Sequence, residues 1–199
     1  MTQQDWRKRL IVGITGASGT IYGVRLLQAC RALGLETHLC MSKAAELTLA
    51  SELDLKSAEV KALADHVYAA HDIGGAIASG SFKTRGMIIA PCSVRTMSDI
   101  ANGTTHTAIA RAADVVLKER RRLVLMLRET PLHAGHLESL LKLAHIGAVI
   151  APPVPAFYIR PKSVEELVDH AVGRALDLLD IDNDLPHRWR EGEGEKEAP

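Results

Sequence analysis

Short apolar runs alternate with amphipathic helical patterns along most of this chain, and this alternation restricts its fold more than any other feature. The runs at 10–14, 36–41, 86–92, 123–127 and 148–151 have the length and composition of buried strands. Between them, apolar residues recur every three or four positions, as on one face of a helix. Strands that alternate with helices form a parallel sheet covered by helices. We therefore predict an α/β fold with a mostly parallel sheet.

The helical patterns can be placed more closely. Helices are predicted at about 21–30, 43–51, 57–65, 105–120, 133–145 and 163–180, with a weak additional strand at 66–70. The 199 residues, 47% of them hydrophobic, are enough for one full core. We expect an N-terminal extension at 1–8, a single domain at 9–189 and a disordered acidic tail at 190–199.

The bulk composition excludes several functional classes. Lysine plus arginine equals aspartate plus glutamate, 24 each, and only 4% of residues are aromatic, which argues against nucleic-acid binding. The polar N-terminus lacks the apolar segment of a signal peptide, and no apolar run reaches the ~18 residues of a membrane span. Three cysteines without C-x-x-C spacing suit buried thiols in a reducing compartment. We therefore expect a cytoplasmic protein.

A glycine-rich turn follows the first strand and opens the first helix. Its glycines, Gly13, Gly16 and Gly19, allow a tight turn, and the helix N-terminus favours an anion. The G-x-G of dinucleotide sites is absent, and no Gly-Lys-Ser/Thr follows, so neither standard nucleotide motif applies. The turn predicts a phosphate or flavin site, although a glycine-rich turn that binds nothing remains the alternative.

Hydroxyl-bearing residues follow two other strands. Ser42-Lys43 comes after the second strand, and Ser93-Val94-Arg95-Thr96 comes after the strand at 86–92. Ligands of such sheets bind beyond the carboxyl ends of the strands. Each serine alone is explained as a helix N-cap. Together with the glycine turn, they favour a nucleotide-like ligand.

The second half of the chain carries a group of charged and phenolic residues that suits a phosphate leaving group, because cations stabilise the charge that develops as the bond breaks. Its members are Arg111, Lys118, Arg128, Glu129, Tyr158 and Arg174. By contrast, we interpret Arg120, Arg121 and Arg122 as a solvated charged face. His133 and His136 lie one turn apart but lack a recognisable set of metal ligands, and Cys92 is better explained as a buried apolar residue than as a nucleophile.

With these residues assembled, the chain closely resembles the UbiX-type flavin prenyltransferases over about residues 10–189. Nine motifs in the same order support the resemblance: GITGASG at 13–19, SKAA at 42–45, SGSF at 79–82, PCSVRT at 91–96, RAADV at 111–115, LKERR at 117–121, RETPL at 128–132, PAFY at 155–158 and VGR at 172–174. The chain departs from the family pattern at Arg95, where lysine is common, and at 105–110. These departures bear on a flavin contact and on a subunit contact, respectively.

The resemblance implies a flavodoxin-like Rossmann fold, a three-layer sandwich that assembles into a dodecamer with FMN between subunits. It implies metal-independent transfer of a dimethylallyl group from dimethylallyl monophosphate to N5 and then C6 of reduced FMN. The product, prenylated FMN, would serve a UbiD-type decarboxylase in ubiquinone biosynthesis or aromatic acid decarboxylation. The monophosphate is what the family suggests, since the sequence alone does not distinguish it from a diphosphate.

The resemblance also assigns residues. Those that would hold FMN are Gly16, Ala17, Ser18, Ser42, Ser93, Val94, Arg95, Thr96 and Arg111. Those that would bind the prenyl phosphate are Lys118, Arg128, Tyr158 and Arg174, with Trp189 as a wall of the prenyl pocket. Catalytic roles would fall to Ser18, Glu52, Lys118 and Glu129, and the division of proton transfer between the two glutamates stays open.

Two other functions remain as alternatives. One is an FMN-dependent decarboxylase of the same fold, which would have no need of Lys118, Tyr158 and Arg174. The other is a non-catalytic flavin carrier or accessory subunit. The phosphate-binding residues favour the prenyltransferase.

Overall fold

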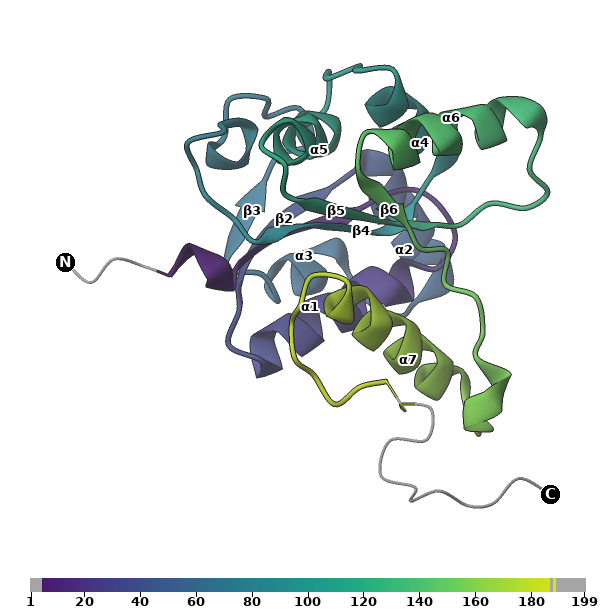
Figure 1. The fold of residues 1–199 in the computed structure, drawn as a ribbon. Coiled ribbons are helices and arrows are strands. Elements are labelled where there is room, and N and C mark those ends of the chain that lie inside the picture. The colour runs from purple at the N-terminus through teal and green to yellow at the C-terminus, as the bar shows by residue number, and fades with distance from the viewer. Residues whose placement is uncertain (1–4, 187, 189–199) are drawn as a thin grey trace.

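The computed structural model describes residues 5–186 and 188, and its centre is a six-stranded sheet (Figure 1). The strands are β1 (Arg9–Ile14), β2 (Glu36–Met41), β3 (His66–Tyr68), β4 (Gly86–Cys92), β5 (Arg122–Leu127) and β6 (Ala148–Ile150). They lie in the order β3-β2-β1-β4-β5-β6, and every neighbouring pair is parallel. This confirms the predicted α/β architecture. The order reverses between β1 and β4, which is where ligands bind in such sheets.

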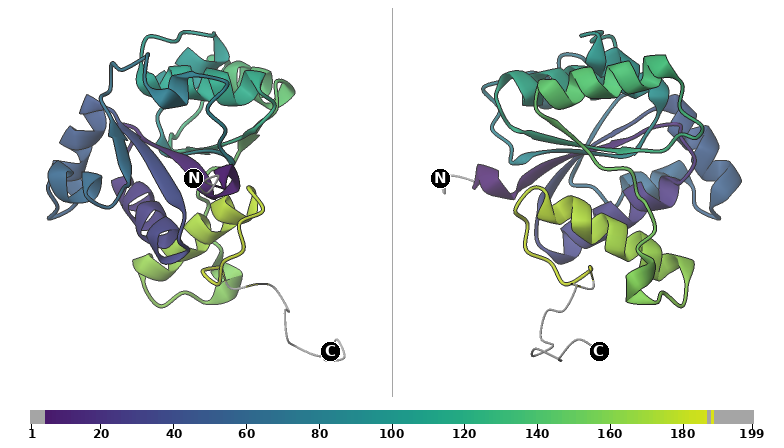
Figure 2. Two further views of the ribbon diagram at one scale, coloured as in Figure 1. Left: turned by 90° about the vertical axis from the view of Figure 1, so that its left-hand side faces the viewer. Right: turned by 45° about the vertical axis from the view of Figure 1, so that its right-hand side comes forward.

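Helices cover both faces of the sheet, giving three layers (Figures 1 and 2). On one face lie α1 (Thr20–Ala32) and α7 (Val164–Asp177), and on the other lie α4 (Val94–Ala101), α5 (Ala108–Lys118) and α6 (Ala134–His145). The remaining helices are α2 (Lys43–Glu52) and α3 (Ser57–Lys61), with short 3₁₀ turns η1 (Trp6–Lys8), η2 (Ala76–Ala78) and η3 (Phe157–Ile159). Among the described residues, no helix has the length and apolar character needed to cross a membrane.

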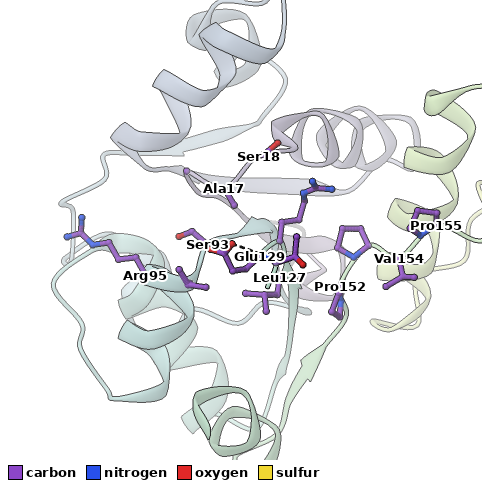
Figure 3. Close-up of a pocket in the computed structure, with 14 residues that line it drawn as sticks. Ala17, Ser18, Ser93, Arg95, Leu127, Glu129, Pro152, Val154 and Pro155 are labelled. Atoms are coloured by element: carbon purple, nitrogen blue, oxygen red, sulfur yellow. Dashed lines mark hydrogen bonds between the residues drawn. The ribbon is translucent and has the colours of Figure 1, made fainter. Parts of the chain in front are cut away.

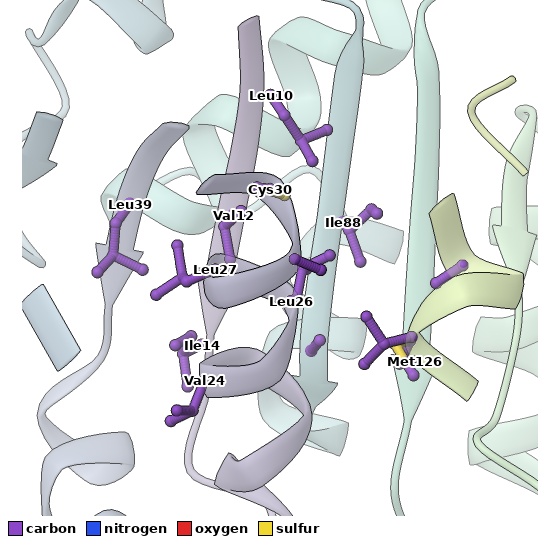
Figure 4. Close-up of a cluster of buried hydrophobic side chains, with 14 of the residues drawn as sticks. Leu10, Val12, Ile14, Val24, Leu26, Leu27, Cys30, Leu39, Ile88 and Met126 are labelled. Carbon is purple, nitrogen blue, oxygen red and sulfur yellow. The ribbon is translucent and has the colours of Figure 1, made fainter. Parts of the chain in front are cut away.

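The core consists of two apolar layers, one on each face of the sheet. Leu10, Val12 and Ile14 of β1 pack with Val24 and Leu27 of α1 in the first layer (Figure 4). The alternate residues of β1 and β4 face the second layer beneath α4 and α5, as the two-residue period of a strand requires. Truncating a fully buried leucine such as Leu27 to alanine would cost about 2–5 kcal/mol.

Most predicted elements are confirmed, and the differences have local causes. The helix expected at 105–120 begins at Ala108 because the Thr107 side chain accepts a hydrogen bond from the Ala110 amide and caps it. It ends at Lys118, before Arg120, which has a φ of 57° and therefore leaves the helical region. The helix expected at 57–65 ends at Lys61, and the weak strand at 66–70 spans only three residues.

Candidate functional site

A hollow of about 740 Å³ lies beyond the carboxyl ends of β1, β4, β5 and β6. Four segments line it: 16–18, 93–95, 127–130 and 152–155. Figure 3 shows Ala17, Ser93, Glu129 and Pro152 around this space. Each segment directly follows a strand, so the expected position of the informative residues is confirmed.

The glycines of the first turn are explained by close packing. A Cβ on Gly16 would lie 2.4 Å from Ala44 Cβ at the start of α2. Gly19 has a φ of +98°, and a Cβ there would lie 2.8 Å from Arg128 Cδ. A side chain at either position would displace its neighbour or strain the backbone. These glycines bring the turn against α2 and Arg128, so their presence is not in itself evidence of ligand approach.

The N-terminus of α1 binds a carboxylate of the chain itself. Glu52 Oε1 and Oε2 accept from the Gly19 amide at 2.9 and 3.0 Å, and Oε2 also accepts from the amide and hydroxyl of Thr20, both at 2.9 Å. Burial would raise the pKa of Glu52, but hydrogen bonds from Ser18, Thr20 and Gly19 outweigh it and lower the pKa. An ionised Glu52 therefore occupies the anion position at the helix end.

The amides just before the helix remain available. Within residues 5–186 and 188, the N–H groups of Gly16, Ala17 and Ser18 donate to no backbone acceptor. The same three residues line the hollow. The anion-binding potential of the turn thus resides in residues 16–18, one step before the helix end where it was expected.

A buried threonine joins the ends of β1 and β4. Thr15 is 1% exposed; its hydroxyl donates to the Pro91 carbonyl at 2.7 Å and accepts from the Ser93 amide at 2.7 Å. This pair of bonds holds the glycine turn and the 93–96 segment at a set separation. The floor of the hollow is therefore preorganised.

A second hollow, of about 590 Å³, adjoins the first and shares Gly16, Ser93 and Arg95 with it. In Figure 3 the Arg95 side chain extends away from Pro152 and Val154. The remaining lining residues are Ser42, Lys43, Ala44, Ala70, His71, Thr96, Asp99, His106, Thr107 and Ile109. Cationic and hydroxyl groups in this hollow suit a phosphate or a polar chain.

Ser42 and Ser93 also serve as N-caps. The Ser42 hydroxyl accepts from the Ala45 amide at 3.1 Å, and the Ser93 hydroxyl accepts from the Thr96 amide at 3.3 Å. The capping interpretation of these serines is therefore confirmed. For Ser42 it does not exclude ligand contact, because the hydroxyl still has a proton to donate. The Ser93 hydroxyl donates to Thr96 Oγ1 at 3.2 Å, so a ligand there would meet its remaining lone pair.

Arg128 and Glu129 follow β5 into the first hollow. The Arg128 guanidinium lies over the Tyr22 ring, 5.7 Å from its centroid, and its Nε is buried with no acceptor among the described residues. A buried cationic donor without an acceptor is costly, so the group is suited to an incoming anion. Glu129 Oε1 accepts from the Thr130 amide at 3.0 Å.

The other cations expected to contact the phosphate are partnered elsewhere in the chain. Lys118 Nζ lies 2.6 Å from Glu119 Oε1, Arg174 pairs with Asp177 at 2.8 Å, and Arg111 pairs with Asp114 at 2.8 Å. The Tyr158 hydroxyl lies 3.4 Å from His170 Nε2. Trp189 lies outside the described residues.

Chain topology explains this separation. Helix α5 starts at the second hollow, where Thr107 is a lining residue, and Lys118 at its far end lies just before β5 begins. Lys118 lines a different hollow, with Asp114 and Lys142. The end of α7 is also tied to the amino edge, because Arg122 and Arg85 donate to the carbonyls of Leu178 and Leu179. A single chain therefore does not bring Lys118 and Arg128 into one hollow.

Several lining residues were not singled out from the sequence, and one interpretation was wrong. Pro152–Pro155 was expected only as a rigid loop, and His71, Asp99 and His106 carry no motif. Position was a signal for Pro152–Pro155 and His71, which follow β6 and β3, whereas Asp99 lies within α4 and His106 between α4 and α5, where no sequence signal marked them. Arg121 and Arg122 are not merely solvated: Arg121 donates to the Gly80 and Phe82 carbonyls.

The buried thiols agree with prediction. Cys30, Cys40 and Cys92 are all free and buried, and burial raises the pKa of each to about 12. A nucleophilic cysteine needs a thiolate near neutral pH. Cys92 is therefore a core residue, despite its place at the end of β4.

Comparison with known proteins places this geometry in a family. The family model described as Flavoprotein matches residues 1–176. The Flavin prenyltransferase UbiX of Escherichia coli is 56% identical over 186 residues, covering 92% of this chain and 98% of the relative.

Two solved structures are similar throughout. AnUbiX, crystallised in complex with FMN and dimethylallyl pyrophosphate, is 50% identical with a TM-score of 0.90, over 92% of this chain and 97% of that one. A dodecameric FMN-dependent UbiX-like decarboxylase from Escherichia coli is 46% identical with a TM-score of 0.89, over 92% of this chain and 100% of that one.

Proposed function

This chain belongs to the Flavoprotein family and, within it, to the UbiX-type flavin prenyltransferases, and from that membership we propose that it transfers a dimethylallyl group to reduced FMN. The observation that carries the proposal is the carboxyl-edge hollow, where residues 16–18, residues 93–95 and Arg128 converge. Dimethylallyl monophosphate is the proposed donor, and prenylated FMN is the product.

The groups around the hollows fit a flavin mononucleotide. Free amides at 16–18 suit the polar edge of a flavin ring, and Lys43, Arg95 and the hydroxyls of the second hollow suit its ribityl phosphate. We assign flavin binding to this pair of hollows, with Ser42, Ser93, Val94 and Thr96 at their junction. Reduced FMN would supply the nucleophilic N5 and C6.

Ser18 and Glu52 form the proposed proton path. The Ser18 hydroxyl helps to lower the pKa of the Glu52 carboxylate, and we propose that a proton from a bound ligand passes through this hydroxyl. Glu52 would then hold that proton, with Gly19 and Thr20 fixing its position. Glu129 at the opposite wall is the second proposed proton carrier.

Arg128 is the residue that we propose stabilises the departing phosphate of the donor. As the bond between the allylic carbon and the phosphate oxygen breaks, negative charge grows on the phosphate, and the Arg128 guanidinium, whose Nε is buried, lowers the energy of that charge. Lys118, Arg174 and Tyr158 would add to it, and Arg111 would hold FMN. The departing phosphate can accept the proton released when the fourth ring closes, so no further strong base is required.

These additional groups lie away from Arg128 in one chain, which supports a site completed by other copies. Lys118, Arg174 and Tyr158 have exposed side chains. A relative of 46% identity forms a dodecamer. We propose that this chain forms a homo-oligomer of the same kind, in which a neighbouring copy brings Lys118 and Arg174 to Arg128.

A second candidate function follows from the same relative, whose name describes an FMN-dependent UbiX-like decarboxylase. Decarboxylation would use oxidised FMN and an acid substrate, and it would leave the phosphate-binding cations without a role. The prenyltransferase explains both the flavin hollows and Arg128. The proposed setting is cytoplasmic, with a UbiD-type decarboxylase receiving the product.

Anaerobic incubation of the full-length protein with reduced FMN and dimethylallyl monophosphate tests the function. Mass spectrometry should show the flavin heavier by one dimethylallyl group, minus the proton it replaces. Parallel reactions with dimethylallyl pyrophosphate separate the two donors, and oxidised FMN with an aromatic acid tests carbon dioxide release. An unchanged flavin mass with both donors would contradict the proposal.

A further inference from the structure

Two histidines and a glutamate cluster at the amino edge of the sheet, away from the flavin hollows. Glu36 and His38 are two residues apart on β2, so their side chains share one face of the sheet. His66, the first residue of β3, is the register partner of His38 on the neighbouring strand. The strand geometry therefore places all three side chains together.

The donor atoms of this cluster already have the spacing of metal ligands. Glu36 Oε1 lies 3.1 Å from His38 Nε2 and 3.5 Å from His66 Nε2. All three atoms lie within 4.8 Å of one another. Ligands at about 2.1 Å from a tetrahedral ion are about 3.4 Å apart. One ion could therefore contact all three atoms after a small adjustment.

Surrounding groups orient the two β2 ligands. His38 Nδ1 lies 3.0 Å from the Tyr68 hydroxyl, which leaves Nε2 to face the cluster, and the Arg9 guanidinium donates to Glu36 Oε2 at 3.2 Å. Such partners hold ligating side chains in position.

His66 gives access to the cluster. Its side chain is 53% exposed, whereas that of His38 is 2% exposed. The two rings are stacked at 4.6 Å and nearly parallel, so His66 must turn to direct Nε2 at an ion between them. Its exposure leaves room for that turn and for a water as fourth ligand.

We propose that Glu36, His38 and His66 form a binding site for a divalent transition-metal ion of the zinc type. Two imidazoles and one carboxylate suit zinc, cobalt or nickel, whereas calcium and magnesium prefer oxygen ligands. The ion would connect β2 to β3, which is a short edge strand of three residues. It has no role in prenyl transfer, because the cluster lies at the opposite edge from the flavin hollows.

Titration of the metal-free, full-length protein with zinc or cobalt tests the site. Calorimetry should give about one ion per chain, and cobalt should give the intense visible absorption of tetrahedral nitrogen and oxygen coordination. At a hundredfold excess over the dissociation constant, the melting temperature should rise by about 5–10 °C.

Matched variants distinguish this cluster from other histidines. His66→Ala should weaken binding at least about tenfold and remove the thermal shift, while its melting temperature without metal stays near wild type. His133→Ala is the control, because His133 stacks on His136 at 3.6 Å and forms the rival histidine pair. Binding unchanged by His66→Ala, or lost in His133→Ala, would overturn the proposal. Flavin prenylation in the presence of a chelator should stay at its full rate. The metal-binding test and the prenylation test can therefore fail independently of each other.

Discussion

The two edges of the sheet differ in how they use charged side chains. At the amino edge, Arg85, Arg121 and Arg122 donate to backbone carbonyls of segments that lie beside them. At the carboxyl edge, Arg128 has a buried Nε without an acceptor among the described residues, and the amides at 16–18 are free of backbone partners there. These three amino-edge arginines are satisfied within the chain, whereas the carboxyl edge leaves donors for a ligand.

This difference separates residues that stabilise the fold from residues that await a partner. Groups satisfied within the chain can be tested through stability, because their partners are already present. Groups left open can be tested only through ligand binding, turnover or assembly. Lys118 and Arg174 belong to the second class despite their ion pairs, since each pair is exposed and worth little.

The largest effect on activity is expected from removing Arg128 or Lys118, the two cations that lie apart in one chain. Arg128→Ala and Lys118→Ala should each lower kcat/KM for prenyl transfer by about 10²–10³-fold, because each removes a donor from the growing phosphate charge. Flavin binding should remain within a few fold. If sites form between copies, refolding an equal mixture of the two inactive variants should restore about a quarter of the sites.

A mixture of Arg128→Ala with Glu52→Gln is the control for this complementation. Both residues act at the same edge of the same chain, so no site in the mixture would have both intact on that side. No recovery with Lys118→Ala would mean that Lys118 and Arg128 do not come from different copies. Recovery in this control would mean that Arg128 and Glu52 do not act from one copy. Rates are measured by flavin mass at fixed times.

The proton path is expected to show the next largest effect. Ser18→Ala and Glu52→Gln should each lower kcat about 10²-fold, because each removes one member of the proposed proton path. Glu52→Gln should also cost about 1 kcal/mol of stability, since Gly19 and Thr20 lose a charged acceptor. Glu46→Gln, on the same helix, is the control for kcat, which it should leave unchanged, although it removes an ion pair with Lys61. Equal rates for Glu52→Gln and wild type would remove Glu52 from the reaction.

Local sequence patterns predicted the fold well, because strand period and helix capping act over a few residues. Strands β2 and β4 begin and end where expected, and Ser42 and Ser93 cap as expected. The interaction of Glu52 with the Gly19 amide spans 33 residues, and the bond of the Ser93 amide to Thr15 spans 78. Such contacts depend on the tertiary arrangement, which no local pattern encodes.

The site was predictable to the same extent. Residues that follow strands meet at one edge for topological reasons, so Gly16, Ser93 and Arg128 could be placed together from the sequence. The separation of Lys118 from Arg128 follows from the same order, since Lys118 precedes β5 and Arg128 follows it, whereas the ion pairs of Lys118 and Arg174 were not predicted. Glu52 was expected near a flavin, and its hydrogen bonds to the start of α1 are an additional finding.

A smaller effect, on flavin affinity, is expected at the second hollow, where we place the phosphate of FMN. Arg95→Ala should weaken FMN binding about tenfold while riboflavin binding stays unchanged, because a guanidinium there acts on the phosphate alone. His106→Ala should weaken it only a few fold. Arg7→Ala at the amino edge, with an exposed side chain, is the control. Affinities are measured by quenching of flavin fluorescence, and equal losses for FMN and riboflavin would contradict the assignment.

The smallest effect concerns an internally satisfied carboxylate at the amino edge. Asp65 Oδ2 accepts from the Thr37 amide at 2.7 Å and from its hydroxyl at 2.9 Å. Burial would raise the pKa of Asp65, but these two hydrogen bonds outweigh it and lower the pKa. A lowered pKa contributes stability above the unfolded-state pKa, and this contribution is lost as pH falls through the folded-state pKa.

Asp65→Asn should therefore destabilise the protein by about 1 kcal/mol or less at neutral pH, since the group is exposed and screened. The difference from wild type should shrink as pH falls below the unfolded-state pKa of about 3.9, because folded Asp65 becomes protonated only below that value. Denaturant melts at several pH values measure it, with Asp54→Asn, an exposed acid, as the matched control. A stability difference that stays constant down to pH ~2 would mean that the charge of Asp65 does not contribute. Asp65 would then no longer be an example of a charged group stabilised within the amino edge.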